Sequence, residues 1–273
     1  MTKRILVIPD VHGRVFWKAP VRKYASQVDR IVFLGDYLDP YGDEDKKTKA
    51  DDIYQNLMEI IELKRRNMDK VVLLKGNHDQ HYYSKRFDEQ AGGTRQDLHH
   101  WAKYHHAFAE NKELFKIAYS ERVNALPYLF SHAGLTSYWL KKVNMHVWNL
   151  DERHLSVSDP SVIERINQLD DEGKGQDMLA VIGSSRSWFG EKTGSVLWAD
   201  VGEHDMHNEP HAYGLDQVFQ VFGHTRLRPG YDKIESDHFA MIDSRQCFMI
   251  DEAVEEKILT IEKYEARRGG AFG

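Results

Sequence analysis

Five segments of the chain share one pattern, a short run of apolar residues that stops abruptly at glycine and polar residues. They are RILVIPDVHG (4–13), DRIVFLGDYLD (29–39), DKVVLLKGNHD (69–79), LPYLFSHAGL (126–135) and QVFQVFGHTRL (217–227). Each run has the length of a strand and is apolar at successive positions, which is typical of a strand buried on both faces of a sheet. The pattern therefore predicts five buried strands.

Between the first strands the periodicity changes to that of a helix. Residues 53–64 place Ile53, Leu57, Ile60 and Ile61 on one face. Alternation of strands and helices predicts parallel βαβ units, in which ligands bind at the carboxyl ends of the strands. Because polar residues follow every apolar run, we expect five sets of functional groups to meet at one edge.

The other segments carry weaker patterns. Residues 94–117 are predicted to be helical and carry His99, His100, His105 and His106, interpreted as a solvated helix face. From residue 237 onward, HFAMID, QCFMID and KILTIEKY are predicted strands of an antiparallel sheet or sheet edge. Without an internal repeat or a linker, we expect one domain over residues 1–273, with helical cap segments at about 80–120 and 140–195.

Composition limits the classes of function. The chain of 273 residues has 37 Lys and Arg against 43 Asp and Glu, a net charge of −6. This balance argues against a protein that mainly binds the nucleic-acid backbone. Three features favour a cytoplasmic protein without a membrane span. They are the mean hydropathy of −0.61, the single cysteine (Cys247) and the short apolar run at the start of the chain.

The polar residues that follow the strands are candidate metal ligands. Asp10 and His12 are two apart, and in an extended chain their side chains would point the same way, toward one ion. Asp36 has two oxygens and can bridge two ions. Further donors for a second ion are Asn77, His132 and His224. This mixture of oxygen and imidazole donors suits Mn, Fe, Zn or related divalent ions.

Each of these residues has an ordinary structural explanation when taken alone. An Asp or His after a strand is usually a turn former or a helix cap. Turn formation does not explain five such sites in order, each at the end of a buried run. The five together therefore indicate a metal site.

The same motifs resemble those of a known family. DVHG, GDYLD, GNHD, the His of SHAG and GHT match in order the five blocks of the calcineurin-like metallophosphoesterases, over residues 5 to 250. The resemblance implies an α/β fold, a four-layer α/β/β/α sandwich of two mixed sheets with helical insertions. GHT is followed by Arg226, whereas many phosphodiesterases of the superfamily have a second histidine there. In this respect the chain is similar to the serine/threonine phosphoprotein phosphatase and diadenosine-polyphosphate hydrolase branch.

The resemblance also implies a role for each residue. Asp10, His12 and Asp36 would bind the first metal, and the second would be held by Asp36, Asn77, His132 and His224. His78 would be the general acid, oriented by Asp39, which would favour the charged imidazole. Two divalent ions, Mn first and Fe, Zn, Co or Ni as alternatives, would activate a hydroxide for in-line attack on phosphorus.

One motif departs from the family pattern. The phosphoprotein phosphatases read GDYVDRG, with an arginine that holds phosphate, whereas this chain reads GDYLDPYG with Pro40 at that position. Arg186 and Arg226 are the candidate replacements for substrate binding. An ordinary surface arginine or ion pair is the alternative interpretation of either. His81, close behind GNHD, is interpreted as part of a turn.

These observations favour a metal-dependent phosphomonoesterase. Its substrate would be a phosphoprotein, a nucleotide or a dinucleoside polyphosphate. The first alternative is a phosphodiesterase acting on a cyclic nucleotide or a nucleic-acid end. The second is a catalytically silent scaffold, which should have gaps in the ligand set, and none is missing. The sequence predicts a phosphorylated substrate as partner, no membrane and no strong nucleic-acid signature, and it leaves the oligomeric state open.

Overall fold

Two mixed β-sheets form the centre of the computed structural model, which describes residues 2–41, 49–83, 95–171, 173–206, 209 and 211–270. The first sheet has the strand order β11-β10-β1-β2-β3-β4. Strands β1 to β4 are parallel, and β10 and β11 continue the sheet antiparallel. Their bounds are Arg4–Ile8 (β1), Arg30–Phe33 (β2), Val71–Leu74 (β3), Phe115–Lys116 (β4), Phe248–Asp251 (β10) and Leu259–Thr260 (β11).

The second sheet has the order β5-β6-β7-β9-β8. Its inner pairs β6–β7 and β7–β9 are parallel, and its outer pairs are antiparallel. The bounds are Ala118–Val123 (β5), Leu126–Ser131 (β6), Phe219–Phe222 (β7), Ile234–Glu235 (β8) and Phe239–Met241 (β9). All five apolar runs of the sequence thus contain a strand of one of the two sheets.

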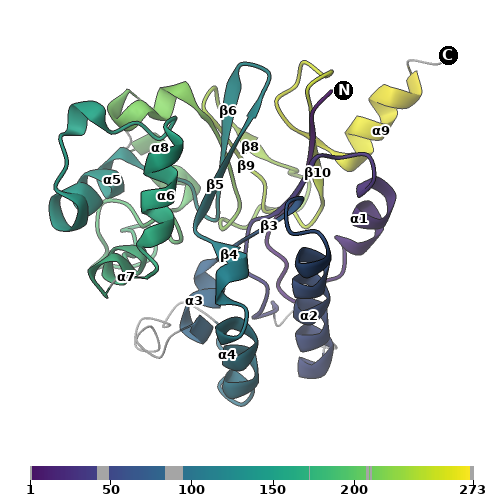
Figure 1. Ribbon diagram of the computed structural model, residues 1–273, viewed down its shortest axis with the longest axis horizontal. Coiled ribbons are helices and arrows are strands. Elements are labelled where there is room, and N and C mark those ends of the chain that lie inside the picture. The colour runs from purple at the N-terminus through teal and green to yellow at the C-terminus, as the bar shows by residue number, and fades with distance from the viewer. Residues whose placement is uncertain are drawn as a thin grey trace.

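The two sheets pack face to face, and helices cover their outer faces. Along β1, Ile5 and Val7 lie in the core between the sheets, whereas Leu6 and Ile8 pack under the helices. This alternation explains why the run is apolar at every position. Figure 1 shows the resulting four layers, which confirm the predicted α/β/β/α sandwich.

Different helices cover the two sheets. The first sheet is covered by α1 (Lys18–Tyr24), α2 (Ala50–Arg66), α4 (Trp101–Ala109) and α9 (Ile261–Gly270). The second is covered by α5 (Ser137–Val143), α6 (Pro160–Gln168) and α7 (Gly173–Leu179). The remaining helices are α3 (Asn77–Tyr83), α8 (Val201–Met206), η2 (Lys112–Leu114), η3 (Asn144–Trp148), η4 (Glu152–His154) and η5 (Ala212–Gln217). Segment 140–195 therefore builds much of the outer layer on the second sheet.

The segment from 94 to 117 is less helical than predicted. It contains α4, η2 and then β4, which pairs with β3 at the edge of the first sheet. Residues 84–94, part of the predicted cap at 80–120, lie outside the described residues. Within the described ranges, no helix has the length and apolar character needed to cross a membrane.

The C-terminal strands are also arranged differently from the prediction. β9 pairs with β7 in the second sheet, and β10 pairs with β1 in the first, so the two are not successive strands of one antiparallel sheet. In KILTIEKY only Leu259–Thr260 is a strand, and Ile261 begins α9. Tyr264 of this helix is buried in the core of the first sheet, and this tertiary contact outweighs the local preference for strand.

A charged cluster joins α9 to the same sheet. Asp251 Oδ2 accepts a hydrogen bond from Arg4 Nε at 2.7 Å and another from the Tyr264 hydroxyl at 2.7 Å. Burial raises the pKa of the Asp251 carboxyl, but hydrogen bonds from the Ala253 amide, Tyr264 and Arg4 outweigh burial and leave the pKa lowered. A lowered pKa means that the ionised carboxylate stabilises the folded state.

We expect Asp251→Asn to lower the free energy of unfolding at neutral pH. The stabilisation by Asp251 is fully present above the pKa of an unfolded Asp, about 4, and is lost as pH falls through the lowered folded pKa. The difference between wild type and variant should therefore be constant from pH 7 to about 5 and shrink below about 4. Urea unfolding across this range measures it, and a difference independent of pH would contradict the ionic interpretation.

Candidate metal centre

The polar residues that follow five strands meet at one edge of the sandwich. Asp10, Asp36 and Asn77 come after β1, β2 and β3 of the first sheet, and His132 and His224 follow β6 and β7 of the second. All five side chains are buried. The strand ends of both sheets therefore build the single edge that the sequence predicted.

The backbone at this edge is strained at several of these residues. His12, Asp36, Asp39 and His224 have φ values of 45°, 50°, 57° and 69°, in the left-handed region that residues with side chains rarely adopt. Such conformations persist only where the surrounding structure enforces them, and they concentrate at functional sites.

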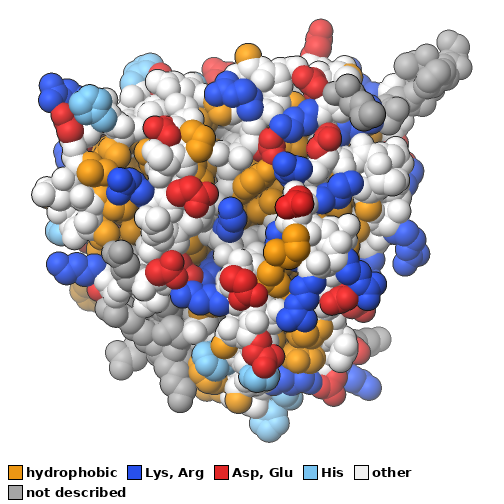
Figure 2. All heavy atoms as spheres, in the orientation of Figure 1, with side chains coloured by type: hydrophobic (Ala, Val, Ile, Leu, Met, Phe, Trp, Pro, Cys, Tyr) orange, Lys and Arg blue, Asp and Glu red, His pale blue; other side chains and the backbone are white. Residues whose placement is uncertain are grey.

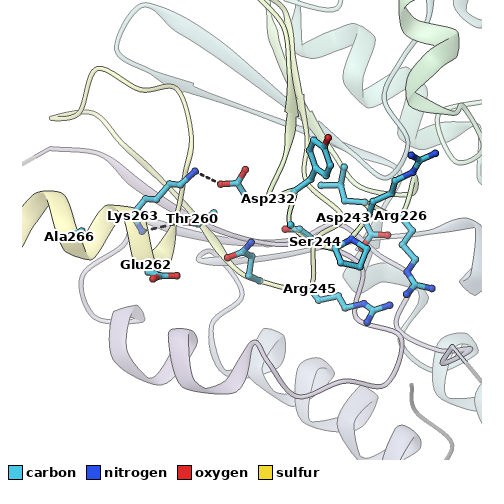
Figure 3. A pocket seen from close by; sticks show the side chains of 15 residues that line it. Arg226, Asp232, Asp243, Ser244, Arg245, Thr260, Glu262, Lys263 and Ala266 are labelled. Atoms are coloured by element: carbon cyan, nitrogen blue, oxygen red, sulfur yellow. Dashed lines mark hydrogen bonds and ion pairs between the residues drawn. The ribbon is translucent and has the colours of Figure 1, made fainter. Parts of the chain in front are cut away.

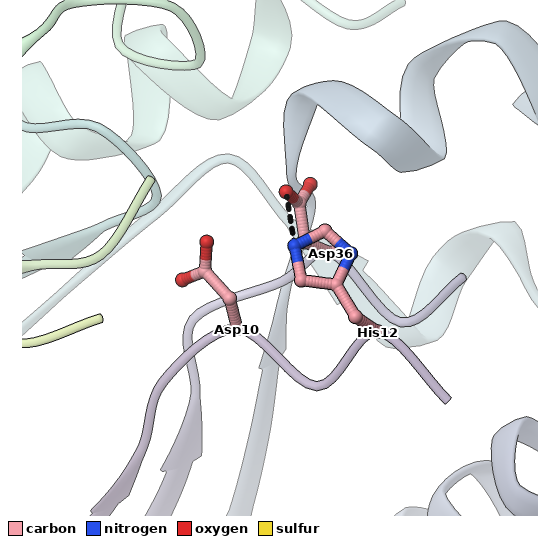
Figure 4. A group of neighbouring side chains, drawn as sticks. All are labelled: Asp10, His12 and Asp36. Carbon is pink, nitrogen blue, oxygen red and sulfur yellow. Dashed lines mark ion pairs between the residues drawn. The ribbon is translucent and has the colours of Figure 1, made fainter. Parts of the chain in front are cut away.

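Asp10, His12 and Asp36 form the first group (Figure 4). Their ligand atoms all lie within 4.8 Å of one another. His12 Nδ1 is 2.8 Å from the carbonyl oxygen of Leu38 and donates to it, so the Nε2 lone pair faces Asp36 Oδ2 at 3.4 Å. β1 ends at Ile8 and His12 is left-handed, so the loop brings Asp10 and His12 together. Asp10 and His12 do lie together as expected, but the expected reason, an extended chain through both residues, was wrong.

Asn77, His132 and His224 form a second group beside the first. His132 Nδ1 donates to the Leu34 carbonyl oxygen at 2.9 Å, which leaves Nε2 as an acceptor. This Nε2 lies 2.9 Å from Asn77 Oδ1, 3.2 Å from His224 Nδ1 and 3.5 Å from Asp36 Oδ1. Asp36 thus directs one carboxylate oxygen toward each group.

The electrostatics of both groups suit divalent cations. Burial and the neighbouring carboxylates Asp243 and Asp36 raise the pKa of Asp10 well above its ordinary range, and burial followed by the charge of Asp79 does the same for Asp36. Burial lowers the pKa of His132 to about 3, so this ring is neutral. Carboxylate and imidazole lone pairs therefore face one another, an arrangement that a cation between them stabilises. The residues fit two divalent ions, and their mixed O and N donors admit several transition metals.

Two glycines allow the backbone to come close to these carboxylates. A Cβ at Gly223 would lie 1.9 Å from Asp10 Oδ1, and one at Gly76 would lie 2.1 Å from Asp36 Oδ1. Asp79 ties the loops together, because its carboxylate accepts hydrogen bonds from the backbone amides of Asp36, Tyr37 and Gly76. The sequence interpretation gave Asp79 no role, although it belongs to the GNHD motif.

His78 lies beside the first group with its ring centroid 5.1 Å from that of His12. Its Nδ1 is 3.0 Å from Asp39 Oδ2, the expected pair. Burial lowers the pKa of His78 more than the hydrogen bond to Asp39 raises it. Asp39 thus favours the charged imidazole, as expected, but burial outweighs it, and the protonated ring is a stronger acid than free histidine.

Asp39 has further partners that the sequence interpretation missed. His81 Nε2 lies 3.1 Å from Asp39 Oδ2, and the Tyr82 hydroxyl donates to Oδ1 at 2.6 Å. His81 is buried and orients this carboxylate. The signal was present in the spacing, because residues 78 and 81 are three apart and share a helix face on α3.

The two candidate substrate-binding arginines lie in different surroundings. Arg186 makes two hydrogen bonds of 2.9 Å to Asp200, which also accepts from the Thr225 hydroxyl. Arg226 is exposed, and its guanidinium carbon lies 4.7 Å from the centre of the Tyr41 ring. Arg186 is therefore engaged in an ion pair, whereas Arg226 is directed toward the loop that follows β2.

Comparisons with known proteins give a matching family model and solved structures for this chain. A family model described as calcineurin-like phosphoesterase matches residues 3–227. A cold-active protein-tyrosine phosphatase has a similar fold, with a TM-score of 0.52 and 14% identity over 92% of this chain and 74% of that one. A second structure, the cold-active protein-tyrosine phosphatase of a psychrophilic Shewanella species, has a TM-score of 0.48 and 14% identity over 92% and 76%. A comparison with curated proteins finds no match.

Proposed function

Because the chain belongs to the calcineurin-like phosphoesterase family, it is a metal-dependent phosphoester hydrolase, and we propose that it hydrolyses phosphomonoesters with a centre of two divalent ions. The position of Asp36 carries this proposal. Its two oxygens lie 3.4 Å from His12 Nε2 and 3.5 Å from His132 Nε2, one in each ligand group. A carboxylate with one oxygen toward each of two sets of donors is suited to bridge two ions.

The ligand set divides between the two positions. Asp10, His12 and Asp36 would hold one ion, and Asp36, Asn77, His132 and His224 would hold the other. When bound, the ions would neutralise phosphoryl oxygens and lower the pKa of water. We propose manganese as the first choice, with Fe, Zn, Co and Ni compatible with the same donors.

His78 is the general acid that protonates the leaving oxygen in this proposal. Asp39 accepts from Nδ1 and fixes the ring, so Nε2 is the atom that gives its proton to the leaving oxygen. As water adds to phosphorus, the bond from phosphorus to the leaving oxygen breaks and that oxygen takes the proton from His78. Burial makes the imidazolium more acidic, which favours this transfer.

The charge near the site favours a monoester over a diester. Arg226 occupies the place where many phosphodiesterases of the superfamily have a second histidine, and it lies over Tyr41. Tyr41 in turn lies edge-on to His12, with ring centroids 4.9 Å apart. A guanidinium beside the metal site stabilises a doubly charged monoester more than a singly charged diester.

The test compares one monoester with its diester. Protein treated with EDTA and then loaded with Mn²⁺ should hydrolyse para-nitrophenyl phosphate faster than bis(para-nitrophenyl) phosphate, and EDTA should abolish both activities. Loading with Zn²⁺, Co²⁺, Ni²⁺ or Fe²⁺ ranks the metals. A preference for the diester would replace the proposal with a phosphodiesterase, and absence of hydrolysis with every metal would contradict it.

A further inference from the structure

Four arginines from separate parts of the chain surround the ring of Tyr41. The guanidinium carbons of Arg14, Arg95, Arg226 and Arg245 lie 5.4, 3.8, 4.7 and 5.7 Å from the ring centre. Arg14 follows β1, Arg95 precedes α4, Arg226 follows β7, and Arg245 lies between β9 and β10. We call these four residues and Tyr41 the arginine cluster.

The cluster borders the metal centre. Tyr41 contacts the ring of His12, with centroids 4.9 Å apart. Arg95 donates to the backbone carbonyl oxygens of Asp39 and Pro40 at 2.9 and 3.1 Å. It therefore brings a guanidinium to the place in the GDYLDPYG motif where Pro40 provides none. A group bound at the ions would have the cluster as its neighbour.

The guanidiniums lie close enough to repel one another. The charge of Arg14 adds to burial in lowering the pKa of Arg245. Asp243 is buried, which raises the pKa of its carboxyl, whereas the charges of Arg14, Arg226 and Arg95 lower that pKa. Its negative charge therefore balances part of the repulsion between the guanidiniums. Arginines gathered around one aromatic ring and adjacent to a phosphoesterase centre are suited to hold phosphate oxygens.

A groove leads away from the cluster (Figure 3). It has a volume of about 690 Å³, with Arg226, Asp243 and Arg245 at one end. The opposite end lies against α9, where Lys263 pairs with Asp232. This volume is in the range that holds a small organic ligand. The cluster is therefore placed between the metal centre and a groove that can take the rest of a substrate.

On this basis we propose that the arginine cluster binds a second, non-reacting phosphate, so that the preferred substrate carries an oligophosphate chain. The proposal rests on the proposed phosphoesterase function and extends it from esters to a phosphoanhydride: water would add to the terminal phosphorus, and the bond from that phosphorus to the bridging oxygen of the chain would break. Four guanidiniums offer more donors than one phosphoryl group held by metal ions would use. The chain would extend from the ions across Tyr41, and its end would lie in the groove. The source is inorganic polyphosphate or a nucleotide.

Charge elsewhere on the molecule argues against a nucleic-acid backbone as the ligand. The net charge is −6, and Figure 2 shows positive and negative side chains interspersed over the face it presents. A protein that follows a nucleic-acid backbone needs a basic stripe. The cluster is instead a local positive site beside the reacting centre.

Binding to metal-free protein tests the cluster without relying on hydrolysis. Titration calorimetry in EDTA should show inorganic tripolyphosphate binding at least about tenfold more tightly than orthophosphate, since more charge-assisted hydrogen bonds form. Arg14→Gln and Arg245→Gln should each weaken tripolyphosphate binding about tenfold and orthophosphate binding less. Arg14→Lys and Arg245→Lys, which keep the charge, should recover part of the loss. The matched control is Arg153→Gln, since the Arg153 side chain is 84% exposed, pairs with Asp151 and lines neither the cluster nor the groove; this variant should bind like wild type.

Several results would overturn the proposal. They are equal affinity for tripolyphosphate and orthophosphate, equal weakening by Arg153→Gln and Arg14→Gln, or tighter binding of a single-stranded oligonucleotide than of tripolyphosphate. A nucleoside triphosphate that binds more tightly than tripolyphosphate would identify a nucleotide as the source, and equal affinity would identify the inorganic chain. Hydrolysis of para-nitrophenyl phosphate by metal-loaded protein is measured separately. Failure of the cluster and failure of the phosphoesterase function are therefore distinguishable.

Discussion

Asp36→Asn should remove bound metal and lower kcat for para-nitrophenyl phosphate by on the order of 10³-fold. The substitution keeps the shape of the side chain but removes the negative charge and one of the two oxygens that face the ligand groups. Both ion positions depend on that carboxylate, so affinity should fall at both. Metal per chain by plasma mass spectrometry and kcat with saturating Mn²⁺ measure the two effects.

The control for this variant is Asp51→Asn. Asp51 lies on α2 with 83% of its side chain exposed and pairs with Lys103 on the surface, so its loss should change neither metal content nor kcat. A full complement of two ions in Asp36→Asn would show that Asp36 does not bridge them. Thermal unfolding of both variants separates loss of metal from loss of fold.

His78→Asn should slow hydrolysis by about 10²–10⁴-fold for substrates with a poor leaving group, the usual contribution of a general acid. The loss should be at least tenfold smaller for para-nitrophenyl phosphate than for phenyl phosphate, because para-nitrophenolate leaves without a proton. The reason is the position of the ring, with Asp39 3.0 Å from Nδ1 and Nε2 left to transfer the proton. Rates over a series of aryl phosphates give the leaving-group dependence.

Metal content distinguishes a role for His78 in proton transfer from a role in metal binding. Asn at position 78 should leave metal binding as in wild type, and His154→Asn, whose side chain is 81% exposed, is the matched control. Equal losses for phenyl and para-nitrophenyl phosphate would contradict a general acid at this position. They would show that His78 acts by positioning the phosphoryl group.

Most of the fold could be predicted from the chain because buried parallel strands carry their pattern locally. Each of the five apolar runs contains a strand, and the helix predicted at 53–64 is part of α2 (Ala50–Arg66). The errors lie at the C-terminus and in segment 94–117. Strands β9 and β10 join different sheets, and Ile261 begins a helix where the pattern favoured a strand. Those outcomes depend on packing partners far along the chain.

The candidate metal centre was visible in the sequence for a related reason. Its donors directly follow the strands, so their order and spacing mark a common edge of the fold. The structure brings all six candidate ligands together there. It also shows what spacing could not, the left-handed backbone at His12 and Asp36 and the contact of His81 with Asp39.

The sequence by itself determined the five strands of the apolar runs, the donor atoms and the edge at which they meet, because strand burial and strand-end chemistry are local properties. Only the tertiary structure decided that Arg14, Arg95, Arg226 and Arg245 surround Tyr41, and that Arg186 is paired with Asp200. A surface arginine has the same local pattern whether it faces solvent or substrate. Its role depends on the path of its loop, which is set by contacts between residues far apart in the chain.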